Sequence, residues 1–276
     1  DDANIADHYQ INEQSSALLP ETADAGDAYQ NETLFIGDSN TVRLYANGLI
    51  SLQQFCAKEG IGTSAALNEG IVTFKKDSSR YTIAEAVAKM KPRRVVIMLG
   101  TNDTGMAVED FINNYKQLVQ AIQTSYPYTD IIVNTVPPVP ADHSNYPNMD
   151  QTRIDDFNMA LLSMCEEMGL KFLNTAEALK DSTGYIPDPD ETLQSGKGVC
   201  FDYASLGAAM LRSQGIPAKI VTGTVSPQGI YHAWIMVNID GTWQSARFSV
   251  SPNTWSRIDL TFAATGDGAN VGDGES

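Results

Sequence analysis

The chain has 276 residues, of which 42% are hydrophobic and 19% are charged, a composition typical of globular proteins. Its net charge of −16 at pH 7 should repel nucleic-acid phosphates, so we exclude nucleic acid as a partner. No apolar run approaches the roughly 20 residues that a membrane-spanning helix requires, and we therefore expect no transmembrane segment.

Residues 1–29 form an acidic lead, with seven carboxylates and no Lys or Arg. The lead contains no signal-peptide pattern of basic and apolar residues. Its composition resembles the spacer that follows a signal sequence or a lipid anchor. We therefore expect a linker over residues 1–29 and an extracellular or cell-envelope location.

Three cysteines, Cys56, Cys165 and Cys200, leave at least one thiol free because their number is odd. No paired Cys or His spacing indicates zinc, and no acidic cluster has the spacing of a calcium loop. We expect neither a metal nor a cofactor.

From residue 33 the chain alternates apolar runs with helical patterns. The runs are "TLFIG", "RRVVIML", "DIIVNTV" and "LKFLNT", and two long amphipathic patterns lie among them. Continuous apolar runs are expected of parallel strands covered on both faces. Residues 30–183 are therefore predicted to form an α/β domain with a parallel sheet and helices on both sides.

Two polar clusters follow predicted strands, "GDSN" after the first and "GTND" after "VVIML". Each alone is explained by ordinary turn chemistry. Ligands of open α/β sheets bind beyond the carboxyl ends of the strands, so the two clusters together indicate a site.

These two clusters belong to a set of three motifs that resemble those of a known enzyme family. "FIGDSNT", "EGIGTSAAL" and "LGTND" resemble the first three blocks of the SGNH (GDSL-like) esterase and acyl-hydrolase family. The resemblance implies a flavodoxin-like parallel sheet over residues 30–183, with Ser39 as the nucleophile. It also implies an oxyanion hole made by the Ser39 N–H, Gly62 (or, less well placed, Gly60) and the Asn102 side chain.

The Asp-x-x-His block that ends this family is absent. The chain has three histidines, His8, His143 and His232, and none stands at the family position. His143 follows the "DIIVNTV" strand and is the alternative base, although a surface loop histidine is the simpler interpretation. A serine without a base is a weak nucleophile at neutral pH.

In the second half, "GKGVCFDYASLGAAMLRSQGIPAK" predicts a turn and a helix that ends at Gly215. Cys200 falls in the first helical turn, where the positive end of the helix lowers a thiol pKa. The alternative is a buried structural cysteine.

"GIYHAWIMVNIDGTW" predicts two strands joined by a turn, with His232 near the start of the first. A further strand in "WSRIDLTFAAT" carries Asp259. Asp240 is a rival carboxylate, but its Asp-Gly context is that of a turn. Thiol, imidazole and carboxylate in this order are the groups of thiol hydrolases.

The same segments resemble the transglutaminase-like superfamily over residues 184–265, in its Cys, His and Asp blocks. The resemblance implies a small papain-like α+β domain with Cys200, His232 and Asp259 as the catalytic triad. Residues 266–276, rich in Gly and Asp, are predicted to be a flexible tail.

The main hypothesis is a thiol-dependent amide-acyl hydrolase or acyltransferase that acts on proteins or peptides at the cell envelope. Its first domain would serve as a scaffold or a binding surface. Two alternatives stay open. One is a serine esterase that uses Ser39 to deacylate envelope glycans, with cell-wall glycan or peptide as partner. The other is a non-catalytic envelope interaction module.

Overall fold

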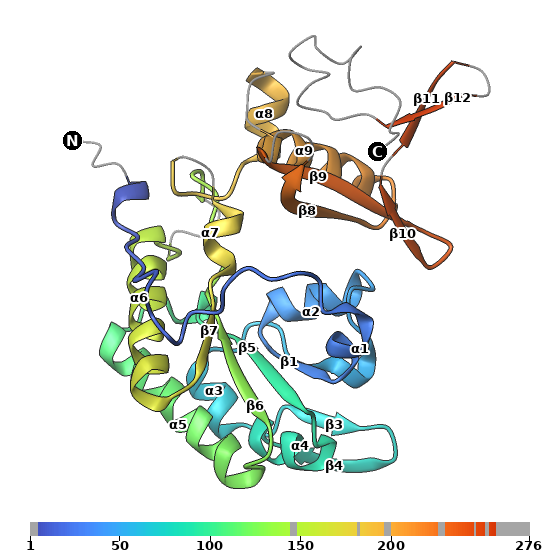
Figure 1. Cartoon of the computed structure of the whole chain (residues 1–276). Helices are drawn as coiled ribbons and strands as arrows, with labels where there is room; N and C mark the ends of the chain where they lie inside the picture. Colours follow the sequence, from blue (N-terminus) through green and yellow to red (C-terminus); the bar gives the residue numbers. More distant parts are fainter. Residues whose placement is uncertain are drawn as a thin grey trace. The chain divides into compact units, whose positions relative to one another are not determined.

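The structure is a computed structural model of the chain (Figure 1). It divides into two compact units, Asp1–Tyr185 (unit 1) and Ile186–Ser276 (unit 2), and each is described by itself. The residues that the structure describes are 5–143, 148–180, 183–195, 200–225, 230–245, 247–251 and 254–257.

Unit 1 contains a five-stranded parallel sheet in the order β2-β1-β5-β6-β7. Counted among themselves in chain order, these strands read 2-1-3-4-5, which is the flavodoxin-like order. This confirms the predicted fold class. The strands are β1 (Thr33–Gly37), β2 (Phe55–Ala57), β5 (Arg94–Met98), β6 (Asp130–Asn134) and β7 (Lys171–Leu173).

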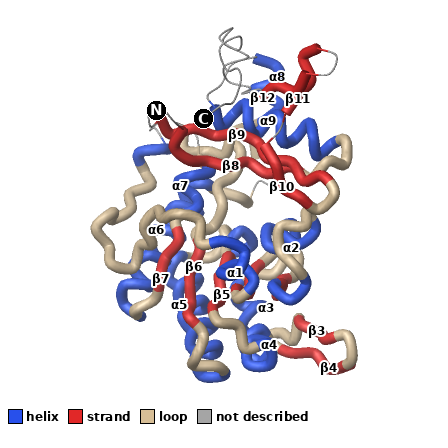
Figure 2. The backbone as a smooth tube through the Cα atoms, turned by 45° about the vertical axis from the view of Figure 1, so that its right-hand side comes forward, coloured by secondary structure: helices blue, strands red, loops and turns tan. Residues whose placement is uncertain are grey.

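Helices flank the sheet (Figure 2). The two long amphipathic patterns form α5 (Val108–Ser125) and α6 (Gln151–Met168), and the apolar face of α5 is buried as its spacing predicts. Phe111 of α5 and Phe157 of α6 stack with their ring centroids 3.9 Å apart. The other elements are α2 (Ser39–Ala46), α3 (Thr63–Asn68), α4 (Ile83–Met90), α7 (Thr175–Leu179) and the hairpin of β3 (Val72–Phe74) and β4 (Asp77–Tyr81).

Much of the acidic lead packs on the rest of unit 1, which differs from the linker that its charge predicts. Residues 5–19, here called the strap, contact α6 through His8 and Gln10 and then pair with β7. The Phe172 N–H donates to Ala17 O at 2.8 Å, and the Leu19 N–H donates to Phe172 O at 2.9 Å. Ala17 is 4% exposed, within the core. The strap covers the edge strand β7, whose unpaired backbone groups would otherwise face solvent. A short helix, α1 (Gly26–Asn31), leads into β1.

Unit 2 has an antiparallel sheet in the order β10-β9-β8, on which α9 packs. Small residues of α9, Ala204 and Ala208, are buried, as are Ala233, Ile235 and Val237 of β9. This helix on an antiparallel sheet is the α+β arrangement expected of the second domain. Its elements are α8 (Pro189–Ser195), α9 (Cys200–Ser213), β8 (Ala218–Val225), β9 (Ile230–Ile239) and β10 (Thr242–Ser245), followed by the pair β11 (Arg247–Ser251) and β12 (Thr254–Arg257).

The predicted turns of unit 2 are present. Asp240 and Gly241 have φ values of 52° and 83°, as a two-residue hairpin turn requires, and Gly215 ends α9 with φ 74°. The predicted third strand is described only over Thr254–Arg257, so Asp259 and the predicted tail lie outside the described residues. Within the ranges that the structure describes, no helix is long and apolar enough to span a membrane.

Candidate functional site

Ser39 is the first residue of α2, directly after β1. Asp38 caps this helix, and its Oδ1 accepts from the Asn40 N–H at 2.9 Å. A Cβ on Gly37 would lie 2.2 Å from Thr41 Oγ1 and 2.5 Å from Met98 O, so only glycine fits between β1, β5 and α2. The first N–H groups of a helix have no intrahelical acceptor, so the Ser39 N–H is free to face an oxyanion.

The Gly62 and Asn102 loops are joined by hydrogen bonds. Asn102 Nδ2 donates to Ile61 O at 2.9 Å, next to Gly62, which is the N-cap of α3. The buried Asp103 accepts from the Thr63 N–H at 3.0 Å and from Thr63 Oγ1 at 2.8 Å. A Cβ on Gly62 would lie 2.7 Å from Asp103 Oδ1, so glycine allows this close approach. Gly60 is exposed and has a φ of 73°, as a turn residue would.

A third link ties these loops to the serine. Asn40 Nδ2, one residue after Ser39, donates to Thr101 Oγ1 at 3.1 Å, one residue before Asn102. The loops that carry Ser39, Gly62 and Asn102 are therefore fixed to one another at the carboxyl edge of the sheet. Sequence reasoning did not identify the Thr63–Asp103 clamp, although both residues stand next to motif residues.

Two buried carboxyl groups lie close to this edge. Burial raises the pKa of Asp38, bonds from Asn40 lower it, and the charge of Asp103 raises it. Burial likewise raises the pKa of Asp103, against the lowering effect of its bonds from Thr63. Asp38 Oδ2 is buried and has no hydrogen-bond partner among the described residues. Burial thus shifts Asp38 toward its neutral form relative to a solvent-exposed carboxyl group.

The two histidines of unit 1 have other partners than Ser39. His8 Nε2 lies 2.8 Å from Asp156 Oδ1, and His143 Nδ1 lies 3.1 and 3.0 Å from the carbonyl oxygens of Pro140 and Ala141. Among the described residues, no hydrogen bond joins an imidazole to Ser39. The described residues thus give the Ser39 site candidate oxyanion donors and no bonded imidazole.

Cys200 is the first residue of α9 in unit 2 and is half-exposed. All three cysteines are free, and the other two differ from it: burial raises the pKa values of Cys56 and Cys165 to about 12. At neutral pH the Cys56 and Cys165 thiols are therefore protonated and shielded. Of the three cysteines, Cys200 alone combines solvent access with the positive end of a helix.

The predicted partners of Cys200 are placed only in part. His232 lies in β9, paired with Gly223 of β8, and its side chain is outside the described residues, as is Asp259. Asp240 lies at the other end of β9, eight residues from His232, or roughly 26 Å along an extended strand. Asp240 therefore serves the turn and is not within reach of His232. Over the described part of the chain, no group of three or more His, Cys, Asp or Glu could hold a metal ion.

Two family models match the chain. The model of the GDSL-like lipase/acylhydrolase family matches residues 35–193, and that of the transglutaminase-like superfamily matches residues 170–248. The two matches overlap over residues 170–193, around the division between the units. Both suspected families are thus found, in the expected order.

Individual relatives are distant. A UPF0252 protein of Archaeoglobus fulgidus is 33% identical over 63 residues, which are 23% of this chain and 20% of that protein. An uncharacterized protein of Mycobacterium leprae is 35% identical over 72 residues, 22% of this chain and 26% of that protein. The chain thus spans a fifth to a quarter of these curated relatives. A GDSL-like lipase structure from Bacteroides thetaiotaomicron is 15% identical, covers 69% of this chain and 90% of that chain, and has a TM-score of 0.42.

The GDSL-like match is the more extensive of the two. It covers more than half of the 276 residues and includes Ser39, Gly62 and Asn102. The chain therefore belongs to the GDSL-like lipase/acylhydrolase family of hydrolases, and its C-terminal unit is similar to the transglutaminase-like superfamily.

Proposed function

We propose that the chain is a thiol-dependent amide-acyl hydrolase or acyltransferase with Cys200 as its nucleophile. The observation that carries this proposal is the placement of Cys200. It opens a 14-residue helix, it is half-exposed, and its helix packs on the strand that contains His232. The match of residues 170–248 to the transglutaminase-like superfamily supports the same assignment.

In the proposed reaction, the Cys200 thiolate attacks the carbonyl carbon of an amide. The C–N bond breaks, and the leaving amine takes a proton from the His232 imidazolium. The acyl group then sits on sulfur as a thioester. Water resolves it to a carboxylic acid, or a second amine resolves it to a new amide, and His232 accepts the proton in either case. Asp259 would orient the imidazole ring.

The proposed substrates are proteins or peptides, and the proposed location is the cell envelope. Whether water or an amine resolves the thioester depends on how well the site excludes water. In this proposal unit 1 acts as a scaffold or a binding surface for the substrate.

The test measures ammonia release from a glutamine-containing peptide library, with and without an added primary amine. We expect release by the native chain and by Ser39→Ala, and none by Cys200→Ala. Ammonia release that survives in Cys200→Ala, or that is absent from the native chain and every variant, would contradict the thiol proposal.

A second function is favoured by a separate observation, the linked Ser39, Gly62 and Asn102 loops. Their donors suit the oxyanion of ester hydrolysis, and His143 is the candidate base within unit 1. The test is hydrolysis of p-nitrophenyl acetate and of an acetylated glycan. Activity lost in Ser39→Ala and kept in Cys200→Ala would support the esterase; the opposite pattern would refute it. If neither enzyme activity is found, the interaction module is the remaining proposal.

A further inference from the structure

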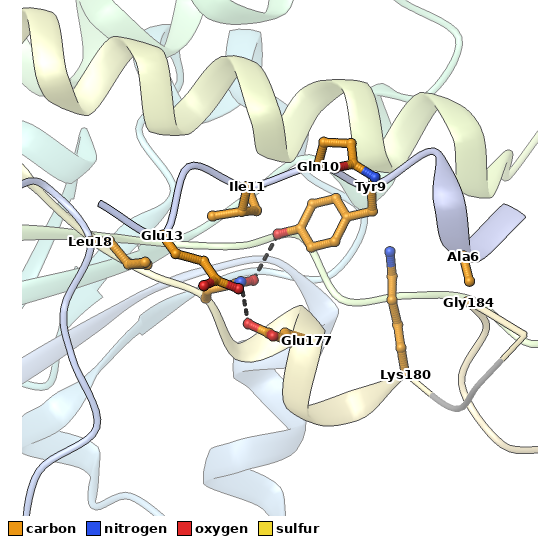
Figure 3. A pocket seen from close by; sticks show the side chains of 10 residues that line it. Ala6, Tyr9, Gln10, Ile11, Glu13, Leu18, Glu177, Lys180 and Gly184 are labelled. Carbon is orange, nitrogen blue, oxygen red and sulfur yellow. Dashed lines mark hydrogen bonds between the residues drawn. The ribbon is translucent and has the colours of Figure 1, made fainter. Parts of the chain in front are cut away.

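Unit 1 contains a cavity whose lining residues include none of the candidate active-site residues. It lies between the strap and α7 and has a volume of about 320 Å³ (Figure 3). Two strands, β5 and β6, lie between β1 and β7 in the sheet order, so β7 lies three strand spacings, or roughly 14 Å, from β1, after which Ser39 follows. Its lining residues are Ala6, Tyr9, Gln10, Ile11, Glu13, Leu18, Asn174, Glu177, Lys180 and Gly184.

The walls of this cavity are fixed by polar contacts. Tyr9 Oη, from the strap, donates to Asn174 Oδ1 at 2.7 Å. The Ala176 N–H of α7 donates to Thr135 Oγ1 at 2.8 Å, which ties α7 to the end of β6. A Cβ on Gly184 would lie 2.8 Å from the Ala6 backbone nitrogen, so the strap also closes tightly against the end of unit 1. The cavity is thus formed by elements held in place on both sides.

The one lysine among the lining residues is already neutralised. Lys180 Nζ bonds to Asp155 Oδ1 at 2.5 Å, and their side chains are 7% and 0% exposed. One face of the Tyr9 ring covers the same ammonium group, 3.9 Å from the ring centroid. Tyr9 itself stays a neutral donor, because burial and the charges of Asp155 and Glu177 raise its pKa.

Two carboxylates line the cavity, both on solvent-exposed residues, and the charge of one of them, Glu177, also acts on the Lys180 ammonium group. Glu13 reaches it from the strap and Glu177 from α7 (Figure 3). Glu13 has no hydrogen bond or ion pair to any described residue. Glu177 accepts one hydrogen bond, from Asn174 Nδ2 at 2.9 Å. The cavity therefore offers carboxylate acceptors and negative charge on its solvent-exposed side, a combination that suits a donor-rich cation.

We propose that this cavity binds the primary ammonium group of a small polar ligand. An ammonium group supplies three N–H donors and one positive charge, which match the two carboxylates. Ile11 and Leu18 offer an apolar wall for the ligand's carbon atoms. The volume is at the lower limit of ligand pockets, which restricts the ligand to about the size of an amino sugar or a dipeptide.

The test is isothermal titration calorimetry of the full chain at low salt with glucosamine and with alanyl-alanine. Their N-acetylated forms lack the positive charge and carry one added acetyl group, so the Glu13→Gln and Glu177→Gln variants separate the effect of charge from that of size. We expect one or both amines to bind and both acetylated forms to bind at least about tenfold more weakly. Binding of glucosamine alone would identify an amino sugar, and binding of the dipeptide alone would identify a peptide amino terminus. Equal binding of free and acetylated forms, or no binding of either amine at millimolar concentration, would overturn the proposal.

Matched variants locate the binding. Glu13→Gln and Glu177→Gln keep the side-chain shape, and each should weaken amine binding about fivefold. Glu21→Gln, an exposed acid beyond the strap, should leave the affinity unchanged. Ser39→Ala and Cys200→Ala should also bind normally, so this result does not depend on either catalytic proposal. Equal affinities of Glu13→Gln, Glu177→Gln and the native chain would place any binding elsewhere and refute the assignment.

Discussion

The buried Lys180–Asp155 pair provides the sharpest test of how unit 1 is held together. In Lys180→Met the cation is replaced by an uncharged chain of similar length, and Asp155 stays behind at 0% exposure. Gln151 Nε2 still donates to Asp155 Oδ1 at 2.8 Å, but Oδ2 has no partner among the described residues. Removing one partner of such a pair costs about 3–5 kcal/mol of unfolding free energy.

The loss should depend on pH. Burial raises the pKa of Asp155, and the bond and charge of Lys180 lower it. Without Lys180 the pKa rises further. A carboxyl group whose pKa is raised in the folded state destabilises that state at pH values above the raised pKa. This destabilisation fades as the pH falls through the raised pKa, because a neutral carboxyl group costs less free energy to bury than a charged one. The difference in unfolding free energy between the native chain and Lys180→Met should therefore be largest near pH 8 and smaller near pH 5.

The assay is thermal unfolding followed by far-UV circular dichroism, with tryptophan fluorescence as an internal reference. All three tryptophans, Trp234, Trp243 and Trp255, belong to unit 2, so their signal reports on that unit. At about 2–4 °C per kcal/mol for a unit of this size, the expected drop in Tm of unit 1 is about 6–20 °C at pH 8.

Two comparisons decide the result. Lys116→Met removes an exposed pair with Glu167, 2.6 Å long, and should change the unfolding free energy by less than about 1 kcal/mol. Lys180→Met with Asp155→Leu should recover most of the loss, since no buried charge is left. A Lys180→Met loss no larger than that of Lys116→Met, or one that is equal at pH 5 and pH 8, would refute the reasoning.

Three further predictions concern glycine packing, the strap and the thiols. Gly62→Ala places a Cβ 2.7 Å from Asp103 Oδ1 and should lower the Tm of unit 1 and abolish any Ser39-dependent ester hydrolysis; unchanged Tm and hydrolysis would contradict the clamp. Deletion of residues 1–19 should expose the β7 edge and cause concentration-dependent association, measured by light scattering; a monomeric variant of native stability would show that the strap is dispensable. Cys56 and Cys165 should stay unmodified by iodoacetamide at pH 8 in the folded chain, because burial raises both pKa values to about 12; rapid labelling in peptide mass spectra would contradict their burial.

Several elements follow from local patterns in the sequence. β1, β5 and β6 are continuous apolar runs, and α5 carries its apolar residues at helical spacing. β2 has three residues and follows a polar stretch, so periodicity does not reveal it. The strap differs for a physical reason: its charge favours a solvated chain, but the open edge of β7 offers it backbone hydrogen bonds.

Some residues of the candidate sites could likewise be predicted from local motifs, and others could not. Ser39, Gly62 and Asn102 stand at the ends or starts of elements, where local motifs mark them. The bond between Thr63 and Asp103 joins residues 40 positions apart, and that between Tyr9 and Asn174 joins residues 165 apart. Such pairs depend on how the strands are ordered in space, which a single sequence does not specify. The cavity between the strap and α7 could therefore not be predicted from the sequence.

The central claim is that Cys200 is an activated nucleophile, and the pH dependence of its alkylation tests it most directly. Iodoacetamide labelling of Cys200 is followed by peptide mass spectrometry between pH 5 and pH 10, in the native chain and in His232→Ala. The account predicts rapid labelling that persists well below the free-thiol pKa of about 8.5 and is lost in His232→Ala. Labelling that rises only near that pKa, or a Cys200 that never reacts, would contradict it.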